Sequence, residues 1–157
     1  MELAQRMLYL TVVGCLVACG DGPSSAPSVE ELAGSYALDK ESQVFLRDKR
    51  GYGSIPPSIL RLNRDGSVAA TSIPDAYTDG FGKGTGQFVS GVGRWKVEKS
   101  NFGYGVTLDI AQGGSMPPGI YHASSIHLSG RRAPYRIEML LGDPDSRETL
   151  TYERHEG

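Results

Sequence analysis

Apolar side chains alternate with polar ones in short runs along most of this sequence, and this pattern constrains the fold more than any other feature. A period of two places successive side chains on opposite faces of a β-strand, so each run offers one face to a core and one to water. The sequence therefore predicts antiparallel sheet. The alternating apolar residues are Tyr36 and Leu38, Leu60 and Leu62, Trp95 and Val97, Val106, Leu108 and Ile110, Ile126 and Leu128, Tyr135, Ile137, Met139 and Leu141, and Leu150 and Tyr152.

Turn signals separate these runs at short and regular intervals. Residues 63–66 read Asn-Arg-Asp-Gly, a hairpin signal that joins the run ending at Leu62 to a further strand at 68–71. Similar turns are predicted at 99–104, 130–134 and 142–146, and the 21 glycines and 9 prolines favour turns over long helices. We expect an all-β chain with about eight strands in an antiparallel up-and-down barrel, whose interior its own side chains nearly fill.

One short helix is expected before the first strand. Ser28 and Glu31 have the spacing of a capping box, Leu32 supplies an apolar contact, and Gly34 ends the turn.

The first eighteen residues have the pattern of an export signal. Arg6 precedes a 12-residue apolar run over 7–18, which is shorter than the ~20 residues that span a bilayer. Residues 16–19 read Leu-Val-Ala-Cys and resemble the lipobox of bacterial lipoproteins. The resemblance implies that residues 1–18 are removed and that the thiol of Cys19 is acylated. The alternative is an ordinary secretory signal with an incidental cysteine.

The cysteine count agrees with an acylated Cys19. The chain has two cysteines, and Cys15 leaves with the signal, so the mature chain has no pair for an internal disulfide. Acyl chains on Cys19 would make the membrane the principal partner. By resemblance to the enterobacterial sorting rule, Gly20 rather than Asp after the cysteine favours the outer membrane, facing the periplasm, in a cell with two membranes.

The expected organisation has three parts. Residues 1–18 are a lipoprotein signal peptide, residues 19–27 a lipid-anchored flexible tether rich in Gly, Pro and Ser, and residues 28–157 the barrel domain.

Several short motifs resemble those of bacterial lipoproteins with lipocalin-like, calycin-type barrels. They are Leu-Ala-Gly-Ser-Tyr at 32–36, the hairpin at 62–67, Gly-Arg-Trp at 93–95, and the closing stretches 141–146 and 150–154. The resemblance implies that Tyr36 plugs one end of the barrel, at a position where lipocalins proper have Trp. Function does not transfer with a fold, so the site must be argued from residues.

Two regions hold candidate ligand-binding residues. The glycine-rich connection 74–86 is either a flap over the barrel mouth, with Tyr77, Phe81 and Phe88 as apolar contacts, or a disordered hairpin tip. His122 and Ser124 share the parity of Ile126 and would point inward, lining a small pocket or standing solvated at the mouth.

Other function classes lack their residue patterns. A net charge of −2 gives no basic footprint for nucleic acid, and the three histidines have no metal-ligand spacing. No Gly-Lys-[Ser/Thr] follows the glycines, and no Gly-x-Ser-x-Gly is present. The aspartates at 143 and 145 fit a turn better than a calcium loop, and Asp75 and Asp79 share that weak case for calcium.

These observations lead to an expectation of a non-enzymatic, membrane-anchored lipoprotein without cofactor or metal. Its barrel would bind a small apolar ligand or an envelope component. The alternative is a barrel without a ligand cavity that acts as a protein-interaction, inhibitor or structural module. A hydrolase would require an acid, a base and a nucleophile to converge in space.

Overall fold

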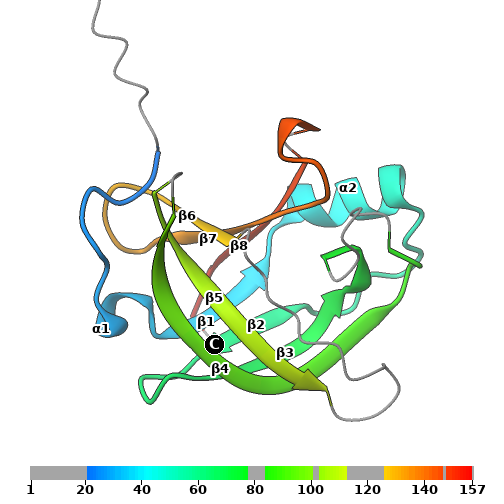
Figure 1. Cartoon of the computed structure of the whole chain (residues 1–157). Coiled ribbons are helices and arrows are strands. Elements are labelled where there is room, and N and C mark those ends of the chain that lie inside the picture. Colours follow the sequence, from blue (N-terminus) through cyan, green and yellow to red (C-terminus); the bar gives the residue numbers. More distant parts are fainter. Residues whose placement is uncertain (1–20, 78–83, 101–102, 113–125, 147, 157) are drawn as a thin grey trace, which may run out of the picture.

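The chain folds into a closed barrel of eight antiparallel strands in sequence order, with the last strand paired to the first (Figure 1). The structure is a computed structural model that describes residues 21–77, 84–100, 103–112, 126–146 and 148–156. The all-β up-and-down barrel predicted from the alternating runs is thereby confirmed. Its strands are β1 Gly34–Leu38, β2 Ile59–Leu62, β3 Ser67–Pro74, β4 Phe88–Ser100, β5 Gly103–Gln112, β6 Ile126–Ser129, β7 Arg136–Leu140 and β8 Thr149–His155.

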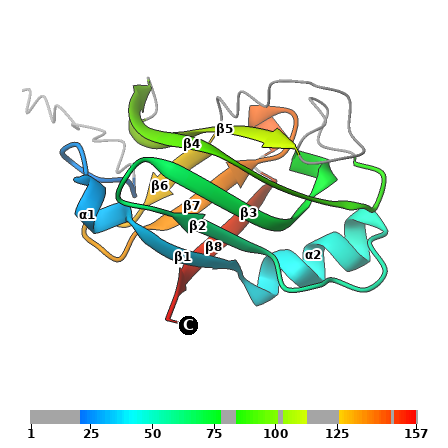
Figure 2. The same cartoon turned by 90° about the horizontal axis from the view of Figure 1, so that it is seen from below.

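The barrel has two chemically different ends, which Figure 2 shows on opposite sides of the molecule. We call one the turn end, because the connections β2–β3, β4–β5 and β6–β7 are short there. We call the other the loop end, because the longer connections β1–β2, β3–β4 and β7–β8 lie there. The two α-helices of the described residues lie at opposite ends of the barrel (Figure 2).

Helix α1 (Val29–Leu32) covers the turn end and has the predicted capping box. The Ser28 side chain accepts from the Glu31 amide, and the Glu31 carboxylate accepts from the Ser28 amide at 2.8 Å. Leu32 is fully buried beneath it. The capping residues therefore fix where the chain enters β1.

Helix α2 (Lys40–Arg50) lies at the loop end, within the β1–β2 connection, and the sequence patterns did not reveal it. Asp39 caps its N-terminus, and Gly51, in the left-handed conformation at φ 72°, ends it. The Ser42 hydroxyl accepts from the Thr151 amide of β8 at 2.8 Å, which attaches α2 to the barrel wall. No helix in the described part of the chain is long and apolar enough to cross a membrane.

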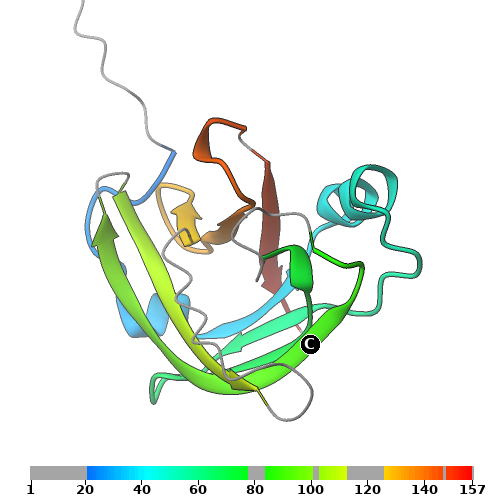
Figure 3. The same cartoon turned by 45° about the vertical axis from the view of Figure 1, so that its right-hand side comes forward.

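The core fills the inside of the barrel with the predicted side chains. Seven of the eight apolar residues expected to form this core are buried. The eighth, Val97, is partly buried and packs against them. Figure 3 shows the strands closing around this interior. The predicted core residues are Leu60, Leu62, Trp95, Val97, Leu108, Ile126, Ile137 and Tyr152.

Glycines in β4 and β5 allow neighbouring strands to approach closely. A Cβ atom on Gly93 would lie 1.8 Å from the Asp109 carbonyl oxygen, and one on Gly105 would lie 2.1 Å from the Ile126 carbonyl oxygen. Among the described residues, strands β5 and β6 pair only at Gly105 and His127, the fewest paired residues of any seam described.

The segment before α1 belongs to the stretch 19–27 that was expected to be a tether. In its described part, residues 21–27, Pro23 and Pro27 are buried. The Gly130 amide of the β6–β7 turn donates to the Asp21 carbonyl at 2.6 Å. Prolines can bury their apolar rings at little entropic cost, which favours this packing.

Candidate functional site

The loop end of the barrel is organised around the buried carboxylate of Asp75. This residue lies in the 3-10 turn η1 (Asp75–Tyr77), directly after β3, at the start of the 74–86 connection. One carboxylate oxygen accepts from the Thr85 amide at 2.7 Å and from the Thr85 hydroxyl at 2.5 Å. The other accepts from the Gln87 amide at 3.1 Å and from the Tyr52 hydroxyl. Asp75 therefore joins both ends of the connection to the β1–β2 segment.

Tyr52 is the second residue of this cluster. Its side chain is 1% exposed, and its hydroxyl donates to Asp75 while accepting from the Ala76 amide at 2.8 Å. Its ring meets Phe88 edge to face, with ring centroids 5.3 Å apart and an interplanar angle of 66°. The cluster thus combines the hydrogen-bonded Asp75 carboxylate with the aromatic pair of Tyr52 and Phe88.

Gly84 is required where the connection returns to this cluster. Its φ is 66°, and a Cβ atom there would lie 2.5 Å from the Tyr52 hydroxyl oxygen and 2.6 Å from the Ala76 nitrogen. Only glycine fits that position without moving the clamp formed by Tyr52, Asp75 and Thr85.

The electrostatics of the cluster keep Asp75 charged and Tyr52 neutral. Burial favours the neutral form of Asp75, but the hydrogen bonds from Thr85, Tyr52 and Gln87 outweigh it, and the pKa of Asp75 lies below its usual value. Burial, and then the hydrogen bond to Asp75, raise the pKa of Tyr52. Through these hydrogen bonds, the Asp75 carboxylate anchors the 74–86 connection to Tyr52.

The predicted ligand-binding residues lie partly in this region. Phe88 is half-buried beside Tyr52, as a contact at the base of the 74–86 connection. The backbone of Tyr77 belongs to η1. Phe81, His122 and Ser124, like the lipidation residue Cys19, lie outside the described residues, so the predictions for them stay predictions.

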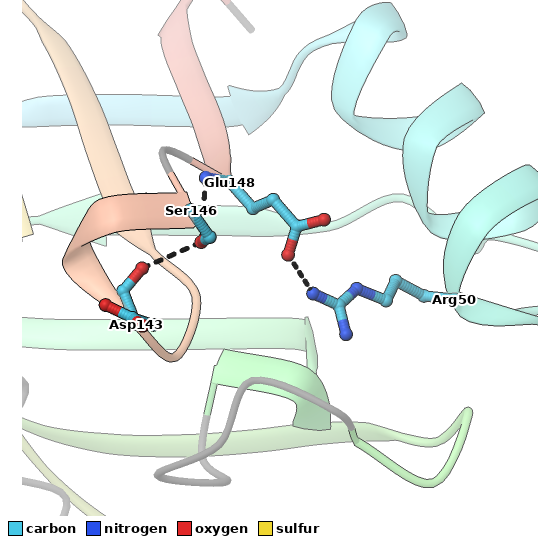
Figure 4. A network of polar contacts seen from close by, with 4 residues as sticks. All are labelled: Arg50, Asp143, Ser146 and Glu148. Atoms are coloured by element: carbon cyan, nitrogen blue, oxygen red, sulfur yellow. Dashed lines mark hydrogen bonds and ion pairs between the residues drawn. The ribbon is translucent and has the colours of Figure 1, made fainter.

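A second polar network at the loop end joins α2 to the β7–β8 connection (Figure 4). Arg50 forms an ion pair with Glu148, whose amide donates to the Ser146 hydroxyl at 3.3 Å. That hydroxyl donates to the Asp143 backbone carbonyl at 2.7 Å, and the Asp143 side chain accepts from the Asp145 amide at 2.9 Å. These contacts form the turn predicted from Asp143 and Asp145.

Large side chains occupy the interior of the barrel. Tyr36, Tyr52 and Tyr152 are each no more than 1% exposed, and the Tyr152 hydroxyl shares a 2.7 Å hydrogen bond with Ser58. Burial raises the pKa of Tyr152. A ligand that entered from the loop end would meet the rings of Tyr52 and Tyr152, whose hydroxyls already have hydrogen-bond partners.

Tyr36 closes the turn end as the lipocalin-like resemblance implied. Its hydroxyl donates to the Leu32 carbonyl at 2.8 Å. The Arg154 guanidinium lies 5.8 Å from the centre of the Tyr36 ring and donates to the Glu31 and Ala33 carbonyls at 2.9 and 2.5 Å. A basic residue therefore packs across the plug and holds the C-terminal end of α1.

Two grooves lie along the described wall of the barrel. One, of about 220 Å³, follows the β4, β5 and β6 strands beside Gly105 and is lined by Glu98, Thr107 and His127 among others. The other, of about 680 Å³, lies between the first turn of α2 and β8, and the Arg136–Glu153 ion pair lines it. Both have mixed polar and apolar walls.

In the described part of the chain, no three His, Cys, Asp or Glu side chains are grouped so that they could hold a metal ion. Sequence reasoning missed Tyr52 and Arg154 as organising residues, and weighed Asp75 only as a weak calcium ligand. Their partners are distant in sequence, and no local spacing signals such pairs.

Comparison of the chain with protein-family models, with curated proteins and with solved structures found no match.

Proposed function

We propose that the protein is a non-enzymatic lipoprotein of the bacterial cell envelope, anchored by acyl chains on Cys19, that binds through the loop end of its barrel. The bound molecule is another envelope component or a small apolar ligand. In a cell with two membranes, the proposal places it on the outer membrane, facing the periplasm.

The observation that carries the proposal is the polarity of the barrel. The chain that follows Cys19 runs against the turn end, where Asp21 meets Gly130. The longer connections and the Tyr52–Phe88 aromatic pair lie at the opposite end. An anchor at Cys19 would thus leave the loop end accessible to a partner.

Between the two kinds of partner, the large side chains buried in the described part of the barrel favour a macromolecular one. The rings of Tyr52 and Tyr152 are buried at the loop end, in space that an open ligand cavity would need. The loops would then present a binding surface, as in the alternative of a protein-interaction module. A small apolar ligand, by contrast, would bind beside the ring of Phe88.

The anchor is tested by two single-cysteine variants. Cys19→Ser should lose fatty-acid labelling and leave the membrane fraction, while its thermal unfolding stays unchanged. Cys15→Ser is the matched control, because that residue lies in the segment to be removed, and it should keep both label and location. Normal fatty-acid labelling of Cys19→Ser would overturn the proposed anchor.

The binding end is tested by photo-cross-linking in intact envelopes. A photoreactive residue replaces Ser54, which is exposed in the β1–β2 connection at the loop end, or Arg64, which is exposed in the β2–β3 turn. We expect a discrete adduct from position 54 and none from position 64. An adduct from position 64 alone would contradict the assignment of the loop end.

A further inference from the structure

The N-terminal segment is attached to one particular turn of the barrel. Besides the Gly130–Asp21 hydrogen bond, Gly22 lies so close to β6 that a Cβ atom there would be 3.1 Å from the Leu128 carbonyl oxygen. Pro23 and Pro27 are buried nearby in the chain. The segment is therefore docked on the β6–β7 turn before it reaches α1.

This docking limits how far the barrel can lie from an acyl anchor. Cys19 precedes Asp21 by two residues, and two residues of extended chain span at most about 7 Å. That distance is shorter than the ~8 Å over which charges act at physiological salt. This step rests on the proposed acylation of Cys19: given that anchor, the β6–β7 turn lies within electrostatic reach of the lipid headgroups.

The β6–β7 turn carries two exposed arginines, Arg131 and Arg132. Within the described residues, neither guanidinium forms an ion pair or hydrogen bond. Arg64 and Lys99 add positive charge to the neighbouring turns of the same end. Two basic side chains beside the anchor are thus available to an external anion.

The acidic residues of the turn end are in part already engaged. Asp65 accepts from the Ser67 amide and hydroxyl, and the Glu31 carboxylate accepts from the Ser28 amide. At the loop end, α2 carries the basic residues Lys40, Arg47, Lys49 and Arg50, but the acidic residues of α2 and of the neighbouring connections outnumber them: Asp39, Glu41, Asp48, Asp143, Asp145 and Glu148. The charge of the surface therefore favours the turn end over the loop end as the face toward an anionic layer.

We propose that the turn end is a membrane-contacting surface on which Arg131 and Arg132 bind anionic phospholipid headgroups. Each basic side chain close to an anionic bilayer strengthens attachment about fivefold. The acyl chains supply the attachment itself, and the arginines set the orientation of the barrel. The loop end then faces away from the bilayer.

The test uses the acylated full-length protein, processed in cells, reconstituted in vesicles of phosphatidylcholine with or without phosphatidylglycerol. A fluorophore is attached at Ser100→Cys in the β4–β5 hairpin at the turn end, or at Ser54→Cys at the loop end. A headgroup-linked quencher lipid reports which end lies near the bilayer. In vesicles with phosphatidylglycerol, position 100 should be quenched strongly and position 54 weakly.

The arginines are tested by the double variant Arg131→Gln/Arg132→Gln. It should lose most of the difference in quenching between the two positions, as should the unmodified protein in phosphatidylcholine alone or at 1 M salt. The matched control, Arg47→Gln/Lys49→Gln, removes two exposed charges from α2 and should keep the difference.

Two results would overturn the inference. Equal quenching at both positions in anionic vesicles, or a difference that survives in the double variant, would contradict headgroup binding while leaving the acyl anchor intact. A chain that fails to float with the vesicles would contradict the anchor, and the inference with it.

Discussion

Single residues join segments of this barrel that are far apart in the sequence. Asp75 connects the start and the return of one connection to Tyr52, which lies in another. Arg154 in the last strand holds α1 and covers Tyr36 in the first strand. The two barrel ends thus depend on one buried carboxylate and one guanidinium.

Replacement of Asp75 by Asn should destabilise the protein by about 2–3 kcal/mol at neutral pH, because hydrogen bonds to a buried charge are lost. The pKa of Asp75 is lowered in the folded state, so its contribution is present above the unfolded value of about 3.9 and disappears as pH falls further. The difference in urea unfolding free energy between the native chain and Asp75→Asn should therefore narrow below pH 4. Asp145→Asn, in an exposed turn, is the control and should change little.

These residue contacts were not predictable from sequence alone. Tyr36 was singled out by resemblance, yet its partner Arg154 is 118 positions away, and nothing local links the two. Asp75 followed a strand like many turn aspartates, and only the fold brings Tyr52 and Thr85 to it.

At the scale of elements, the strands were predictable because each buries one face. Helix α2 was difficult to recognise because it buries few side chains. Strands such as β7 alternate buried and partly buried residues, which the sequence displays directly. Helix α2 buries only Ser42 and Leu46, so it lacks a broad apolar stripe. The capping residues Asp39 and Gly51 were the signal in the sequence from which α2 could have been predicted.

The glycines in the β4–β5 hairpin allow a prediction about strand spacing. Gly93→Ala should cost about 1–3 kcal/mol or more, because the new methyl group would meet the Asp109 carbonyl. Gly53→Ala is the matched control, since nothing lies within 4 Å of a Cβ atom there. Equal melting temperatures for the two variants would contradict the close pairing at Gly93.

At the scale of the whole molecule, the stability of the folded barrel depends on buried tyrosines that stay protonated. Burial raises the pKa values of Tyr36, Tyr52 and Tyr152 above the unfolded value of about 10. Groups with a raised folded pKa contribute full stability below the unfolded pKa and lose it as pH rises. The barrel is therefore expected to weaken in alkali.

An absorbance titration at 295 nm, with circular dichroism in parallel, checks this expectation. The buried tyrosines should ionise only together with loss of sheet signal, after the exposed tyrosines. Tyr152→Phe should flatten the decline in stability above pH 10. Ionisation of Tyr36, Tyr52 and Tyr152 together with the exposed tyrosines, with the fold intact, would show that water reaches the interior.

The pairing of β1 with β8 also affects how the chain folds during its synthesis. Ser35 lies opposite His155, so the ring closes across nearly the whole domain. Such distant contacts form slowly, because a long stretch of chain must be ordered first. Until the final strand emerges, β1 and β7 present open edges on which other chains could assemble. A nascent chain that lost its last few residues would therefore be more prone to aggregate than to form a smaller barrel.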